Sequence, residues 1–286
     1  DELAIGELAL DLCAKLQPQI NIAILESINA AEGEQSAKSL YLKAVNLVSI
    51  RGCHEATFME SAGLLRRSIE LDASLPYAPA FLSLVLAFGY RVGVLSDREA
   101  AKTEALAMAE AALELNDFDT NVLGYCGCAL ADVGMLERGI LLLRKSLHAN
   151  DTNPQAWVAL GAVMILTGNV PAAVEHLDRG MRVSPLDGCL AVWRSIYALA
   201  LILNQDPIAA ESEALLACEH NEKTHMPRIA LAAARLLKKD ARGAQRAVKE
   251  AFRIRPDLPD AEIRYLVGPD LTEQLLSLRE PSPQPG

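Results

Sequence analysis

The chain has 286 residues, of which 51% are hydrophobic and 5% aromatic, with a formal net charge of −10 and a pI of about 5.1. An acidic chain without a polybasic block is poorly matched to nucleic-acid phosphates or to an anionic membrane surface, so we expect direct binding to neither. No uncharged apolar run reaches the roughly 18 residues of a membrane span. Six scattered cysteines are typical of free thiols in a reducing compartment, and we predict a cytoplasmic protein. They are Cys13, Cys53, Cys126, Cys128, Cys189 and Cys218.

Two helices are predicted before residue 36. Leu3–Leu16 and Gln19–Ala31 have apolar residues at helical spacing, but they lack the repeat pattern described below. We therefore assign residues 1–35 to non-repeat helices. Because the sequence starts at Asp1, inside an apparent helix, we expect it to be a fragment of a longer protein with an output domain elsewhere.

Two pairs of helices are expected between residues 36 and 119. Ser36–Ile50 and Glu60–Leu71 form a divergent first pair, and Tyr77–Tyr90 and Arg98–Leu115 form the second. The connection over residues 91–97 is longer than that of the repeats that follow.

The clearest repeat unit begins at Pro154. Gly161, Ala173 and Gly180 are small residues at positions where two helices must approach closely, and Pro185 ends the second helix. Large apolar residues at other positions of the repeat are expected to form the contacts between its two helices. These are Trp157, Leu160, Met164 and Leu177.

The same spacing recurs in neighbouring segments. Ungapped matches begin at Thr120 and at His225, and Cys189–Glu222 fits with a short insertion. The pattern resembles the 34-residue tetratricopeptide (TPR) repeat, with its W-L-G-Y and A-F-A positions and a late proline. The resemblance implies an all-α, TPR-type helical-repeat solenoid, a right-handed superhelix of helix–turn–helix pairs. We predict six repeats, at 36–76, 77–119, 120–153, 154–187, 188–224 and 225–258.

The C-terminal part departs from the repeat pattern. Short helices are predicted at Leu258–Leu266 and Leu271–Leu278, so that residues 259–279 cap the stack. The polar, proline-rich residues 280–286 are expected to be a disordered tail.

Longer stretches suggest a narrower resemblance. Residues 8–30, 64–90 and 267–279, the last reading VGPDLTEQLLSLR, are similar to the C-terminal TPR regions of bacterial multidomain regulators. In those proteins a TPR array follows an OmpR-type winged-helix domain or a class III adenylate cyclase domain. The resemblance implies a part in signalling or transcription regulation, although this chain contains no winged-helix or cyclase sequence.

Catalytic motifs are absent from the sequence. It contains no G-x-G-x-x-G, G-x-x-x-x-G-K-[ST], H-E-x-x-H or G-x-S-x-G pattern. We therefore predict a non-catalytic protein, without catalytic residues and without a cofactor.

Two groups of residues are of the types that bind metals. Cys126 and Cys128 are two positions apart on a predicted helix and point in different directions, and Cys126 occupies a core position. Cys218, His220 and His225 have irregular spacing and no evident fourth ligand, so we interpret the histidines as surface residues near a helix end. We predict no metal site.

Binding is expected on the concave surface. The TPR resemblance implies that the first helix of each repeat lines this surface, and its positions there are apolar and lack the cations that would clamp a peptide carboxylate. An exposed apolar strip implies a partner helix, a peptide or a second copy of the chain, the chain's own N-terminal helices, or alternatively a small apolar ligand. The candidate groove residues are Gln155, Val158, Ala162, Ile165, Val192, Ile196, Met226, Ile229, Ala233 and Leu236.

Overall fold

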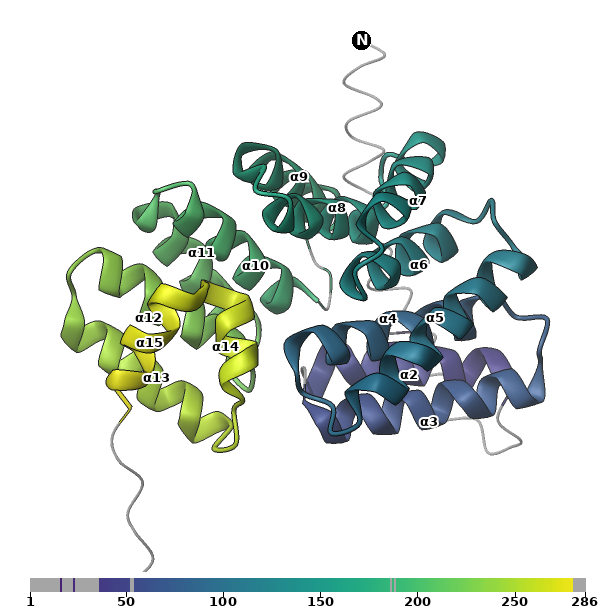
Figure 1. The fold of residues 1–286 in the computed structure, drawn as a ribbon, viewed down its shortest axis with the longest axis horizontal. Helices are drawn as coiled ribbons and strands as arrows, with labels where there is room; N and C mark the ends of the chain where they lie inside the picture. Colours follow the sequence, from purple (N-terminus) through teal and green to yellow (C-terminus); the bar gives the residue numbers. More distant parts are fainter. Residues whose placement is uncertain are drawn as a thin grey trace, which may run out of the picture. The chain divides into compact units, whose positions relative to one another are not determined.

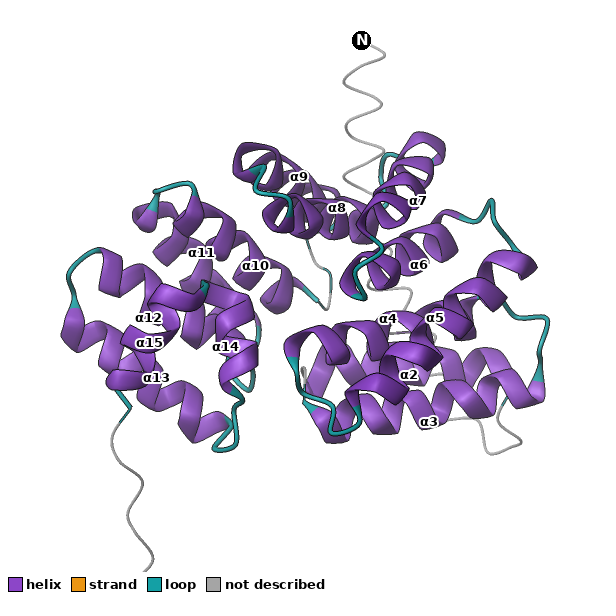
Figure 2. Cartoon of the chain, in the orientation of Figure 1, coloured by secondary structure: helices purple, strands orange, loops and turns teal. Residues whose placement is uncertain are grey.

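The computed structural model describes residues 36–51, 54–185, 187 and 189–279, together with residues 16 and 23. Several predictions concern parts of the chain outside these described residues. They are the helices predicted within residues 1–35, apart from residues 16 and 23, together with Cys13, Cys53 and the tail over residues 280–286. The described ranges contain fourteen helices. No strand is drawn in these ranges (Figures 1 and 2). The predicted all-α class is confirmed.

Two compact units divide the chain, Asp1–Leu190 and Ala191–Gly286. The first contains α2 (Ala37–Arg51), α3 (Glu55–Leu71), α4 (Tyr77–Val92), α5 (Arg98–Leu115), α6 (Thr120–Asp132), α7 (Leu136–Ala149), α8 (Pro154–Leu166) and α9 (Val170–Val183). The second contains α10 (Leu190–Leu203), which begins at the last residue of the first unit, α11 (Pro207–His220), α12 (Met226–Leu237), α13 (Ala241–Ile254), α14 (Asp260–Val267) and α15 (Pro269–Ser277).

Successive helices of the first unit pack as pairs. α2 contacts α3, α4 contacts α5, α6 contacts α7, and α8 contacts α9. The first helix of each pair also packs against the first helix of the next, so that α2, α4, α6 and α8 follow one another through the unit (Figure 1). Each repeat thus contacts its sequence neighbours, which is the arrangement of a helical-repeat stack.

The second unit is closed by its last two helices. α12 packs between α11 and α13, and it also contacts α14 and α15. The two short helices contact each other and are drawn beside α12 and α13 in Figure 1. Apolar residues of α12 and α14 are consequently buried on several sides, including Met226, Ile229 and Ile263, each 0% exposed.

Capping residues and prolines mark the starts of the helices in the sequence. Asp97, Asp119 and Asn153 each precede a helix, and their side chains accept hydrogen bonds from backbone N–H groups of its first turn, for example from Ala156 to Asn153 at 3.2 Å. These bonds satisfy donors that lack an intrahelical acceptor. Prolines in the first turns of α8, α9, α11, α12 and α15 add a residue whose missing N–H is not needed there.

The predicted close approach of α8 and α9 is confirmed at two glycines. A Cβ placed on Gly161 would lie 2.6 Å from Leu177 Cγ and 3.1 Å from the carbonyl oxygen of Ala173. A Cβ on Gly180 would lie 2.7 Å from Val158 Cγ2. Real side-chain carbons do not approach so closely, so these positions require glycine for packing.

Two glycine replacements should therefore change stability in opposite directions. We expect Gly161→Ala to lower the free energy of unfolding by about 1–3 kcal/mol, because Leu177 is fully buried and cannot yield. Gly63→Ala in α3 should raise it by about 0.5–1 kcal/mol, since an added Cβ meets nothing within 4 Å. Urea denaturation followed by circular dichroism measures both. Equal effects at the two sites would contradict the close approach.

One helix begins well before its predicted start, and the other differences in helix bounds are small. The helix predicted to begin at Glu60 begins at Glu55, because the Nδ1 atom of His54 accepts a hydrogen bond from the Thr57 N–H at 3.2 Å and caps the earlier start. The two C-terminal helices begin and end within about two residues of the predicted positions, at Asp260–Val267 and Pro269–Ser277. Gly268 joins them with φ 78°, a conformation that favours glycine. The division into six repeats stays a prediction.

Candidate functional site

The predicted groove residues lie deeper than expected. In the first unit, Gln155 and Ile165 of α8 are half-buried, whereas Val158 and Ala162 are 3% and 7% exposed. In the second unit, Val192 of α10 and Leu236 of α12 are half-buried. The remaining four are buried: Ile196, Met226, Ile229 and Ala233. The expectation of an exposed apolar strip formed by all ten residues is therefore corrected.

Helix packing explains this burial. Val158 points at Gly180, where the absent side chain of α9 leaves room for it. α12 is contacted by α11, α13, α14 and α15, so the face that carries Met226, Ile229 and Ala233 is covered within the second unit. A binding role for the half-buried members stays a prediction.

An aromatic strip crosses the first helices of three successive pairs in the first unit. The ring of Tyr41 in α2 stacks on Tyr77 in α4, with centroids 5.8 Å apart, and meets Phe81 edge-on at 6.3 Å. Phe81 in turn meets Tyr125 of α6 edge-on at 5.3 Å. The three tyrosines are half-buried, and Phe81 is buried. Sequence reasoning missed this strip, although each ring lies on a predicted first helix.

Hydrogen bonding and burial determine the state of these phenols. Tyr77 donates to Asp119 Oδ2 at 2.8 Å, and the other oxygen of that carboxylate caps α6. Burial raises the pKa of Tyr41 to about 12 and raises the pKa of Tyr125 well above its usual range. The hydroxyls therefore stay protonated at neutral pH and can donate hydrogen bonds.

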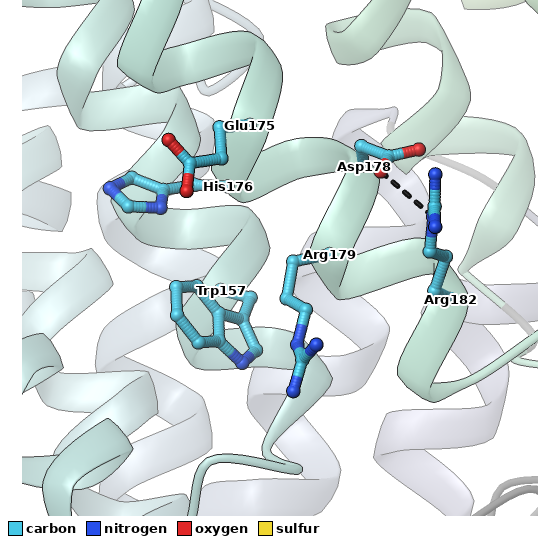
Figure 3. Close-up of a pocket in the computed structure, with 6 residues that line it drawn as sticks. All are labelled: Trp157, Glu175, His176, Asp178, Arg179 and Arg182. Carbon is cyan, nitrogen blue, oxygen red and sulfur yellow. Dashed lines mark ion pairs between the residues drawn. The ribbon is translucent and has the colours of Figure 1, made fainter. Parts of the chain in front are cut away.

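A polar pocket lies between Trp157 of α8 and one face of α9 (Figure 3). The indole N–H of Trp157 donates to the carbonyl oxygen of Asp151 at 2.7 Å, and its ring lies 5.3 Å from that of His176. Burial lowers the pKa of His176, whose Nδ1 atom is buried without a hydrogen-bond partner in the described chain. The charged lining residues are Glu175, Asp178, Arg179 and Arg182.

The charges of this pocket largely cancel. Arg182 pairs with Asp178 at 2.8 Å, and Arg179 lies 3.9 Å from Asp151. A lining of paired charges suits a polar group better than an apolar ligand.

Cys126 is a core residue and Cys128 is half-buried, and neither has the properties of a reactive thiol. Cys126 is fully buried, as predicted, with its Sγ atom 3.7 Å from the Ala109 carbonyl oxygen. Burial raises the pKa of Cys126 to about 12 and that of Cys128 well above its usual range. Both thiols consequently stay protonated at neutral pH, whereas metal ligation and nucleophilic attack require the thiolate.

The histidine interpretation is wrong for one residue. His225, expected on the surface, is 4% exposed, and its Nε2 atom lies 2.5 Å from Glu262 Oε1. His220 is exposed as expected, and Cys218 is half-buried. Across the described ranges, no group of three or more His, Cys, Asp or Glu side chains could hold a metal ion.

Glu262 of α14 is the centre of a buried ionic cluster in the second unit. Its carboxylate is 0% exposed, accepts a hydrogen bond from Arg255, and contacts the ring nitrogen of His225. Nearby, the buried Arg228 donates to the carbonyl oxygens of Asn221 and Thr224 at 2.9 and 2.8 Å. The cluster attaches the capping helix α14 to the end of α13 and the start of α12.

Comparison with known proteins identifies the fold but no close relative. No protein-family model matches the chain, and no curated protein matches it. TTC0263, a TPR protein of Thermus thermophilus, is 20% identical with a TM-score of 0.52, covering 67% of this chain and 99% of that one. The chain has a TPR-type fold.

Two further solved structures have the same fold. PilF of Pseudomonas aeruginosa is 15% identical with a TM-score of 0.51, and the match covers 80% of this chain and 96% of PilF. A chain of the APC/C hetero-tetramer Cut9-Hcn1 is 16% identical with a TM-score of 0.55. That match covers 80% of this chain but 46% of the other, so this chain spans about half the length of that relative.

Helix length and polarity bear on membrane insertion. Among the described residues, no helix is both long and apolar enough to cross a bilayer.

Proposed function

We propose that the first unit of this TPR domain binds a peptide or a helix of a partner protein across its first helices. The observation that supports this most directly is the aromatic strip of Tyr41, Tyr77, Phe81 and Tyr125. Tyrosine combines a large apolar ring with a hydrogen-bonding hydroxyl, and it is enriched where proteins bind one another. Stacked helical repeats commonly use such surfaces for binding.

The composition of the first helices supports the same proposal. α4 and α6 contain one charged residue each, Arg91 and Asp132, and α8 contains none. By contrast, the second helices α5, α7 and α9 carry several charges each. A helix that is apolar around its whole circumference requires cover on every side. The partner would supply cover where neighbouring helices do not, with Gln155 and Ile165 of α8 extending the contact.

An alanine replacement in the strip tests the proposal. A peptide selected from a displayed library against the full chain should bind Tyr77→Ala at least about tenfold more weakly, because an aromatic anchor typically contributes about 1–2 kcal/mol or more. Isothermal titration calorimetry measures the affinity, and circular dichroism checks the fold.

Phe118→Ala is the matched control. Phe118 is 78% exposed and lies outside the strip, so its removal should change the affinity by less than about twofold. Equal losses in both variants, or a peptide whose binding neither variant weakens, would contradict the proposed surface. Sedimentation of the chain alone distinguishes self-association, since a dimer that Tyr77→Ala dissociates would identify a second copy as the occupant.

The sequence resemblance supports a finer proposal about context. We infer that the domain regulates an attached transcription or cyclase domain in the bacterial cytoplasm, with partner binding as the signal. A small apolar ligand is the alternative signal. Titration of the full chain with a fluorescent fatty acid tests that alternative: saturable binding that Tyr77→Ala abolishes, without peptide binding, would favour it.

A further inference from the structure

Charge is unevenly distributed between the two units. Residues 1–190 contain 14 of the 27 basic and 24 of the 37 acidic residues, and residues 191–286 contain 13 of each. The net charge of −10 thus belongs to the first unit, and the second is neutral overall. A local surface of the second unit can therefore be basic although the chain as a whole is acidic.

Such a surface lies along α13. Arg242, Arg246, Lys249 and Arg253 are all exposed and are spaced by four, three and four residues. At about 100° per residue these side chains fall within roughly 60° of one another around the helix, and they span about 16 Å along it. The buried residues of α13, among them Ala247 and Ala251, occupy the opposite side. We call these four residues the basic stripe.

Half of the basic stripe is not neutralised by the chain. In the part of the chain that the structure describes, Arg242 and Arg246 form no ion pair. Arg253 is paired with Glu250, at 2.7 and 2.8 Å, and Glu250 is the one acidic residue of α13 itself. Arg279 lies over the ring of Phe252 at 4.1 Å and adds a further cation beside the stripe.

Elsewhere the chain pairs such arginines with carboxylates of a neighbouring helix. Arg66 of α3 binds Glu104 of α5 through two hydrogen bonds of 2.7 Å, and Glu110 of α5 binds Arg138 of α7. Arg235 of α12 binds Glu211 of α11 at 2.9 Å. Carboxylate–guanidinium pairs thus join neighbouring helices of this fold. Arg242 and Arg246 of the basic stripe have guanidinium groups of the same kind, but no carboxylate of the described chain pairs with them.

We propose that the basic stripe of α13 binds an acidic helical segment of a protein partner. Carboxylates at the same four-three-four spacing would meet the stripe along about three turns, and three of its four cations are arginines, which bind carboxylates through two parallel bonds. An acidic protein segment is favoured over a nucleic acid because the net charge of the chain repels a long polyanion, whereas a short peptide covers the stripe alone. The proposal concerns the second unit and does not depend on the aromatic strip.

The test uses a designed probe with the full chain. An alanine-rich peptide of about 16 residues with glutamates at the four-three-four spacing should bind the chain, and its affinity should fall as salt rises from about 0.05 to about 0.5 M because the contact is ionic. Arg242→Glu combined with Arg246→Glu should weaken binding at least about tenfold, since each like-charge contact is repulsive. Fluorescence anisotropy measures both.

Arg67→Glu with Arg144→Glu is the matched control. These exposed arginines of α3 and α7 give the same change in net charge away from the stripe, so the affinity should change by less than about twofold. If charge reversal on α13 lowers the melting temperature, Arg242→Gln with Arg246→Gln provides the same comparison without repulsion.

Four outcomes would overturn the proposal. The first is equal binding of a peptide with glutamine in place of glutamate. The second is equal loss of affinity in the α3 and α7 control. The third and fourth are tighter binding of a DNA duplex, or of phosphatidylserine-containing vesicles, than of the acidic peptide, because either result would identify phosphate as the preferred group. The Tyr77→Ala variant should bind the acidic peptide normally, since that residue belongs to the other unit.

Discussion

Replacement of Leu160 by glutamate is expected to lower the free energy of unfolding by more than about 3 kcal/mol, because it removes a core side chain and buries a carboxylate without a partner. Leu160 is 4% exposed on α8, a helix that packs against α6, α7 and α9. Urea denaturation of the full chain, followed by circular dichroism, measures the change. The expected result is a large fall in the denaturation midpoint.

Leu141→Glu is the control for the same chemical change. Leu141 lies on α7 and is 66% exposed, so a glutamate there remains hydrated and should change stability by no more than about 0.5 kcal/mol. If Leu160→Glu denatured at the same urea concentration as the parent, the assigned repeat register would be wrong by at least one position.

The repeat register could be predicted because its determinants are local and periodic. Gly161 and Gly180 leave no room for a Cβ in the structure, and glycine at a fixed spacing is visible in the sequence. Helix starts were equally accessible, since Asn153 and Asp119 cap the helices that follow them. The helix Arg98–Leu115 has the predicted bounds because Asp97 caps its start.

The exposure of the candidate groove could not be predicted from register alone. A position on a helix specifies a direction, but burial depends on which residues of other helices lie there. The repeat register predicts that Val158 faces the concave surface, yet its side chain fills the space over Gly180. The aromatic strip could not be predicted from the repeat pattern, because its ring contacts join residues that are far apart in the sequence. They connect α2, α4 and α6, from Tyr41 to Tyr77 and on to Tyr125.

The basic stripe shows how an average conceals a local pattern. Arg242, Arg246, Lys249 and Arg253 already have the spacing of one helix face in the sequence. A net charge of −10 for the whole chain argues against direct binding of nucleic acid, but it does not exclude a local basic surface, because the excess of acidic residues lies within residues 1–190. Counting the charged residues of each predicted helix separately would indicate the basic stripe.

Removal of the buried carboxylate of Glu262 should be the most destabilising single change in the second unit. Glu262→Ala is expected to cost about 3–5 kcal/mol, because it leaves the guanidinium of Arg255 in the interior without this carboxylate. Arg255 is only 7% exposed, so water cannot replace the lost partner. Urea denaturation measures the effect, and Glu273→Ala on the exposed side of α15 is the matched control.

A double replacement separates a requirement for charge balance from a requirement for this ion pair. Arg255→Met with Glu262→Leu removes both charges and fills the space with apolar groups, and such exchanges are often neutral or stabilising. We therefore expect the double variant to recover most of the stability lost in Glu262→Ala, with a coupling energy of about 3 kcal/mol or more in the cycle that includes Arg255→Met and Glu262→Leu as single variants. Additive effects would mean that Glu262 acts mainly through His225, whose ring it also contacts at 2.5 Å, and that Arg255 is held by other groups. If the double variant recovers this stability, then the contact between the end of α13 and α14 requires that no unpaired charge is buried there. It does not require the ion pair itself.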